Sequence, residues 1–315
     1  MRTFILRSLL FFFLLVLLFV AIQLQPRRIP PNDFLYGVAL KHHLADGIQK
    51  PKIILVGGSG VAFGFDSREI RDSLGMPVIN MGMHIQLGLD FMLNETKAVM
   101  KPNDIVFLSP EYMMSMNGRW EAKNAASKFY PPSKAYYPWD PIANFDFILL
   151  VNRRKFKEAL AKVVFSDSDS VYCREAFDTS NGDVIRHLDR AHHSVLAGSG
   201  LKYEYWPGIR AINRFAEYAQ SKNVKVYFLF PSYAASFFQK SWQVIGQYES
   251  DVRKGLKIPV LNTPTDFVYP DSVYYDTEYH LLRAGRKMRT DRFIQLAKTN
   301  PAVRPYLPAP PISSQ

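Results

Sequence analysis

Short apolar runs alternate with amphipathic stretches along most of the chain. The apolar runs predict buried strands at 52–56, 77–81, 104–108, 224–230 and 258–261. Apolar side chains recur at helical spacing over 68–74, 88–100, 208–221, 237–255 and 282–297. Strands that alternate with helices predict an α/β domain whose parallel sheet is covered on both faces.

The most apolar part of the chain is its N-terminus. Residues 8–26 carry no charge, and with Phe4, Ile5 and Leu6 the apolar run reaches the roughly 20 residues that a spanning helix needs. A cleaved signal peptide is the alternative, but the run is long for one and no Ala-x-Ala site follows it. We therefore expect an uncleaved transmembrane signal anchor over residues 1–26.

This anchor would enter the lipid bilayer through residues 5–25. Arginines flank both ends of the run, so the positive-inside rule does not decide its orientation. The default for a single N-terminal anchor places the N-terminus inside. The expected location is the cell membrane, with a single pass and an extracytoplasmic C-terminal domain, periplasmic or extracellular.

Changes in regularity mark the other boundaries. We expect a linker with a short helix at 27–50, a main domain at 51–300, and a Pro-rich tail at 301–315. The main domain contains a less regular insertion at about 113–205, in which 145–164 has the pattern of a helix with a basic face.

Charge and cysteine content narrow the choice of partners. The formal net charge is +11, from 39 Lys and Arg against 28 Asp and Glu. It favours anionic surroundings such as lipid head groups or acidic wall polymers, or is simply a solvated basic surface. The chain has no zinc-finger spacing and no long basic run, so nucleic acid is not an expected partner.

Metal and disulfide chemistry are also not expected. Cys173 is the only cysteine, which excludes an intrachain disulfide and a thiolate metal cluster. The pairs His42-His43 and His192-His193 lack accompanying carboxylate or cysteine spacing, so we interpret both as surface pairs.

Candidate chemistry lies in the loops that follow the predicted strands, where open α/β sheets bind ligands. The first such loop is Gly57-Gly58-Ser59-Gly60, whose glycines allow a sharp turn and close approach of a substrate. Ser59 needs a base to act as a nucleophile, and His280, with Asp276 just before it, is the candidate. The alternative, phosphate binding at a helix N-terminus, is disfavoured because G-x-G-x-x-G and G-K-[ST] are both absent.

Three motifs in order resemble the SGNH/GDSL hydrolase family. Residues 53–59 resemble its first block, which carries the catalytic serine, and residues 78–82 resemble its second, whose glycine donates to the oxyanion. Residues 276–281, followed by Gly285, resemble the last block, which carries the acid and the base. The resemblance covers most of the chain. It implies a flavodoxin-like, three-layer α/β/α domain with about five parallel strands.

The resemblance also implies an activity. Ser59 would attack an acyl carbonyl, His280 would transfer its proton, and Asp276 would orient the histidine, while the amides of Ser59 and Gly82 would hold the oxyanion. The motifs resemble a bacterial, membrane-anchored branch similar to the exported partners of membrane-bound O-acyltransferases. An esterase or acyltransferase of the cell envelope is implied, with an acylated glycan or lipid as substrate, a membrane-bound O-acyltransferase as partner, and no cofactor.

Two departures from the family pattern indicate an alternative. The family's third block contains an Asn that donates to the oxyanion, whereas this chain has Ser109-Pro110-Glu111-Tyr112. Asp276 also lies four residues before His280 rather than three. The alternative is a catalytically impaired module of the same fold that binds polymer or docks a membrane acyltransferase.

Further candidates for oxyanion or substrate contacts are Gly58, Asn80, His84, Glu111 and Tyr112. Glu111 would orient a substrate hydroxyl and Tyr112 would donate to an oxyanion; alternatively, Tyr112 packs under the site while Glu111 pairs with an arginine. His84 either lines the pocket or packs within its own loop.

Overall fold

The computed structural model describes residues 2–24, 33–138, 171–193 and 200–308. The chain divides into two compact units, one comprising 1–33 and 139–170 and the other 34–138 and 171–315. The predicted basic helix at 145–164 and the end of the predicted tail lie outside the described residues.

In the first unit, the structure describes helix α1 (Arg2–Leu24), whose side chains from Phe4 to Leu17 are mostly apolar and exposed. Within the described part of the chain, no helix combines the length and the apolar character that crossing a bilayer requires.

The second unit is built on a parallel sheet of four strands. They are β1 (Ile53–Val56), β2 (Val78–Asn80), β3 (Ile105–Leu108) and β4 (Lys225–Phe228), in the order β2-β1-β3-β4. In the central strand, Ile54 lies opposite Ile79 of β2 and Val106 of β3. The prediction of a buried parallel sheet is therefore confirmed for these strands.

The fifth predicted strand is reduced to a single bridge. Within 258–261, only Val260 pairs with the sheet, opposite Phe228. Pro259 has no N–H to donate, so a regular ladder cannot continue through it. Instead, a small parallel sheet that we did not predict forms from β5 (Tyr233–Ala234) and β6 (Val268–Tyr269).

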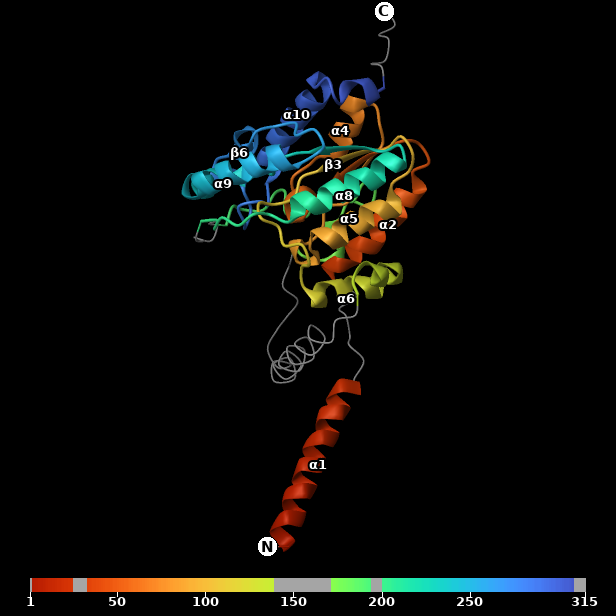
Figure 1. The fold of residues 1–315 in the computed structure, drawn as a ribbon, viewed down its shortest axis with the longest axis vertical. Coiled ribbons are helices and arrows are strands. Elements are labelled where there is room, and N and C mark those ends of the chain that lie inside the picture. The colour runs from red at the N-terminus through yellow and green to blue at the C-terminus, as the bar shows by residue number, and fades with distance from the viewer. Residues whose placement is uncertain (1, 25–32, 139–170, 194–199, 309–315) are drawn as a thin grey trace, which may run out of the picture. The chain divides into compact units, whose positions relative to one another are not determined.

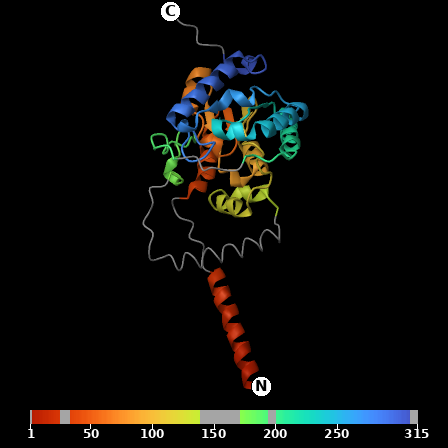
Figure 2. The same cartoon turned by 90° about the vertical axis from the view of Figure 1, so that its left-hand side faces the viewer.

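Helices pack around the two sheets of this unit. They are α2 (Gly37–Gly47), α3 (Ser59–Ala62), α4 (Ser67–Leu74), α5 (Leu89–Val99), α6 (Trp120–Phe129), α8 (Gly208–Ser221), α9 (Ala235–Gly255) and α10 (Arg283–Thr299). Helices α2, α5 and α8 lie on one side of the sheet, and α4 and α10 lie on the other (Figure 1). Helix α9 packs on β5 and β6, at the side of this unit that faces the viewer in Figure 2.

Local signals explain why several predicted helices form where they do. The Asp66 side chain caps α4 by accepting hydrogen bonds from the amides of Arg68 and Glu69. Gly75 ends the same helix with a φ of +70°, a conformation that glycine adopts without strain. By contrast, α6 lies inside the predicted irregular insertion and was not predicted.

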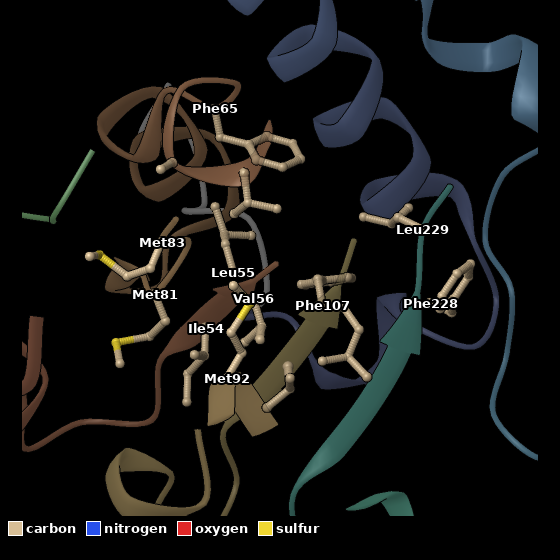
Figure 3. Packing of buried hydrophobic residues seen from close by; sticks show 14 of the residues in the cluster. Ile54, Leu55, Val56, Phe65, Met81, Met83, Met92, Phe107, Phe228 and Leu229 are labelled. Atoms are coloured by element: carbon tan, nitrogen blue, oxygen red, sulfur yellow. The ribbon is translucent and has the colours of Figure 1, made fainter. Parts of the chain in front are cut away.

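The core fixes the strand ends from which the loops depart. All residues of β1 are buried, and Figure 3 shows Leu55 and Val56 packed near Phe107 of β3 and Met92 of α5. Full burial of such a side chain contributes about 1.5–3 kcal/mol. The loops after β1, β2 and β3 therefore begin from well-packed positions at one edge of the sheet.

Candidate active site

A cavity of about 300 Å³ lies at the carboxyl ends of the main strands. Its lining comes from segments far apart in the sequence: Phe34, Ser59, His84, Ile85, Glu111, Tyr172, Thr277, Glu278, Tyr279 and His280. Ser59 and His280 thus face one space, as do two other predicted site residues. A larger surface hollow of about 610 Å³, at the amino end of β4, is lined by residues such as Asn213, Glu217 and Lys257 and contains none of the predicted site residues.

Ser59 is the first residue of the one-turn helix α3, and Glu111 holds this turn from below. The amide of Gly58 donates to Glu111 Oε2 at 3.0 Å, and the amide of Gly60 donates to Oε1 at 2.7 Å. A Cβ atom at position 58 would clash with the Glu111 carboxylate, so a larger residue there would displace Glu111 from the turn. Burial raises the pKa of the Glu111 carboxyl, while the hydrogen bonds from the amides of Gly60 and Gly58 favour its ionised form.

A buried arginine holds the same turn from the other side. Arg289 of α10 is fully buried and donates to the Gly60 carbonyl at 2.6 Å and to Ser109 Oγ at 2.9 Å. Burial lowers its pKa to about 10, an effect that nearby groups including Glu111 oppose. Glu111 therefore binds the amide of Gly60, and Arg289 binds its carbonyl. Together they fix the position of the residue that follows Ser59.

His280 is oriented by a carboxylate. Its Nδ1 lies 2.7 Å from Asp276 Oδ1, across a turn that brings residues four apart together. Burial opposes ionisation of Asp276, but hydrogen bonds from His280 and Tyr172 outweigh it and lower the pKa of the carboxyl. Because Nδ1 donates to Asp276, Nε2 of the neutral ring carries no proton and can accept one.

Tyr172 completes this arrangement and was not predicted. Its hydroxyl donates to Asp276 Oδ2 and lies 3.1 Å from His280 Nδ1. It belongs to a polar tract that the sequence marks as an insertion, where an isolated tyrosine gives no periodic signal. Phe34, another unpredicted lining residue, precedes α2 in the segment that we expected to be a linker with a short helix.

Aromatic stacking connects His280 to the Ser59 turn. The ring of Phe63, which directly follows α3, lies 4.1 Å from the His280 ring at an interplanar angle of 14°. His187 packs on the same phenylalanine, with ring centroids 4.5 Å apart. The base is therefore packed against the element that begins with Ser59.

The loop after β2 differs from the expected oxyanion geometry. The Gly82 amide donates to Asn80 Oδ1 at 2.9 Å, so it is already satisfied. Asn80 is fully buried, and its Nδ2 donates to the Val61 carbonyl and to Asp183 Oδ1. Neither Asn80 nor Gly82 lines the cavity, because these interactions turn Asn80 inward and hold Gly82 beside it.

His84, in contrast, lines the cavity. Its Nδ1 accepts a hydrogen bond of 3.1 Å from the Gln86 amide. Burial, the charge of His280 and the charge of Arg119 all lower the pKa of its ring.

Tyr112 packs beneath the site, as the alternative interpretation of this residue expected. It is buried against Tyr233 and Tyr248 and does not line the cavity.

The interpretation of both histidine pairs as surface pairs is wrong for His42. This residue is buried and pairs with Glu95 at 2.6 Å.

Comparisons with protein-family models, with curated proteins and with solved structures found no match to this chain. In the described part of the chain, no three His, Cys, Asp or Glu side chains are grouped as ligands for a metal ion. What the geometry offers is a serine and a carboxylate-oriented histidine on the wall of one small pocket, which are parts that acyl transfer through a serine requires.

Proposed function

We propose that this protein is an extracytoplasmic O-acyl esterase or O-acyltransferase that works through Ser59, His280 and Asp276. The observation that carries the proposal is that Ser59 and His280 line one cavity while Asp276 binds Nδ1 of the histidine at 2.7 Å. The strand order β2-β1-β3-β4 corresponds to the first four positions of the flavodoxin-type order, which supports an SGNH-type α/β/α domain.

The reaction would begin when Ser59 Oγ attacks the carbonyl carbon of an ester. His280 Nε2 takes the hydroxyl proton, and the carbonyl electron pair moves onto oxygen. Collapse of the tetrahedral intermediate re-forms the carbonyl and expels the alcohol, which takes the proton from His280. Water or an acceptor hydroxyl then releases the acyl group by the same steps in reverse. Asp276 keeps the ring in position and stabilises its positive charge.

The cavity and the apolar N-terminus support the proposed substrate class. A mainly apolar space of about 300 Å³, bordered by Phe34, Tyr172 and Ile85, suits a short acyl group better than a long chain. The apolar run at the N-terminus supports attachment to the cell membrane, near acylated glycans or lipids. A membrane-bound O-acyltransferase as partner rests on the sequence resemblance alone.

The test uses the full-length chain in detergent with p-nitrophenyl acetate, an activated ester. Replacing Ser59 with Ala should reduce turnover to the background rate, since the nucleophile is lost. Ser221→Ala is the matched control, because Ser221 lies at the end of α8, remote from the cavity. Equal turnover by wild type and Ser59→Ala would remove the proposal.

A second function, a binding module without catalysis, is favoured by two observations. The Gly82 amide is occupied by Asn80, and the loop after β3 lacks the family's Asn. Such a module would bind an acylated polymer equally well as wild type and as Ser59→Ala and would turn over no ester. Isothermal titration with an acetylated oligosaccharide, alongside the ester assay, separates the two functions.

A further inference from the structure

An acyl-transfer site needs donors for the negative charge that develops on the carbonyl oxygen, and most backbone donors near Ser59 are already used. The amides of Gly58 and Gly60 donate to Glu111, and the amides of 81–83 all have acceptors within the fold. The second residue after β3 is a proline, which has no N–H. In the described part of the chain, the Ser59 amide has no acceptor and remains available at the first turn of α3.

One side chain on the cavity wall carries a further hydrogen-bond donor. His84 Nδ1 accepts the Gln86 amide proton at 3.1 Å, so the proton of the neutral ring resides on Nε2. His84 lines the cavity together with Ser59 and His280. Burial, His280 and Arg119 lower the pKa of the His84 ring, which favours its neutral form.

We infer that His84 is a catalytic residue whose Nε2–H, together with the Ser59 amide, binds the oxyanion in place of the Gly82 amide and the missing Asn. The inference rests on the proposed acyl-transfer function. As Ser59 Oγ bonds to the carbonyl carbon, the carbonyl electron pair moves onto oxygen, and the Nε2–H of His84 donates to it without being transferred. Its proton stays on His84 throughout, while His280 carries the mobile proton. The two histidines on the cavity wall thus have opposite roles. Nδ1 of His84 accepts a hydrogen bond, which leaves a donor at Nε2, whereas Nδ1 of His280 donates one, which leaves an acceptor at Nε2.

The test separates the two nitrogens of His84. An Asn at this position has a polar group near Nδ1 and can still accept the Gln86 amide, whereas a Gln places a donor near Nε2. In full-length protein with p-nitrophenyl acetate, His84→Asn should lower kcat by about a hundredfold or more with little change in KM. His84→Gln should keep kcat within about tenfold of wild type, since a carboxamide can donate to an oxyanion. The midpoint of the pH–rate profile should stay unchanged in both variants, because His280 remains the base.

Three results bear on the inference. Loss of kcat in His84→Asn with retention in His84→Gln supports it. The reverse order, or turnover by both variants within about threefold of wild type, overturns it while leaving the Ser59 mechanism intact. If wild type and Ser59→Ala turn over ester equally, the proposed function itself has failed and the role of His84 fails with it. Thermal unfolding of both variants identifies any loss that comes from misfolding, and reaction rates with a phosphonate ester, which forms a tetrahedral adduct on serine, should fall in parallel with kcat.

Discussion

Replacing Glu111 with Gln tests how the fold holds the Ser59 turn. The carboxylate of Glu111 is buried and accepts the amides of Gly58 and Gly60 at 3.0 and 2.7 Å. A Gln keeps one acceptor oxygen and turns its NH₂ group toward the second amide, so one buried donor loses its partner. That loss costs about 1–3 kcal/mol. The buried Arg289 also loses a nearby negative charge, one of the groups that raise its pKa.

The two effects overlap, and we expect Glu111→Gln to lower the free energy of unfolding by about 2–3 kcal/mol. The assay is urea unfolding of the full-length chain in detergent, followed by tryptophan fluorescence. Glu217→Gln is the control, because Glu217 is an exposed residue paired with Lys257, and it should change the unfolding free energy by no more than about 0.5 kcal/mol.

A double-mutant cycle makes the reasoning stricter. If Glu111 and Arg289 act on the same turn, the variant with Glu111→Gln and Arg289→Met should lose at least about 1 kcal/mol less than the sum of the single losses. Additive losses, or a Glu111→Gln protein as stable as wild type, would refute the view that these two charges compensate each other across Gly60.

Three further predictions concern the histidines and their partners. Asp276→Asn should lower ester turnover at least about a hundredfold and Glu278→Gln should change it little, because Asp276 is the carboxylate that binds the His280 ring; equal small losses in steady-state kinetics would contradict this. Tyr172→Phe removes a donor to Asp276 and should lower kcat by about tenfold while leaving KM near its wild-type value, and an unchanged kcat would show that Asp276 needs no second donor. Burial lowers the pKa of His187 to about 4, so between pH 4 and about 6.5 the unfolded chain binds more protons than the folded chain. The free energy of unfolding should therefore reach its plateau above pH 6.5 and fall by about 3 kcal/mol toward pH 4 in urea titrations. His187→Gln should flatten this slope.

The sequence predicted the sheet well where burial leaves no choice. Strands β1 and β3 are buried on both faces of the parallel sheet, as Ile54 and Val106 show. Burial on both faces requires apolar side chains at consecutive positions, which produces the continuous apolar runs. The failures occur where tertiary contacts decide. Val260 forms only one bridge because of the neighbouring proline, and β5 and β6 are too short to produce a pattern.

The same division applies to the site. Asp276 and His280 are four residues apart, so a single turn brings them together and the sequence can predict their contact. Tyr172 lies 104 residues before Asp276, and no local pattern reports such a contact. The direction of the Gly82 amide depends on the rotamer of Asn80, which Asp183 fixes from a distant segment.

The most direct measurement of the central claim is the reaction of the full-length protein with a fluorophosphonate, followed by peptide mass spectrometry. Our account predicts one adduct, on Ser59, and its loss in His280→Ala, because the hydroxyl reacts only when a histidine can take its proton. Failure of wild-type protein to form an adduct on Ser59, or labelling of Ser59 that is equally fast without His280, would contradict the account.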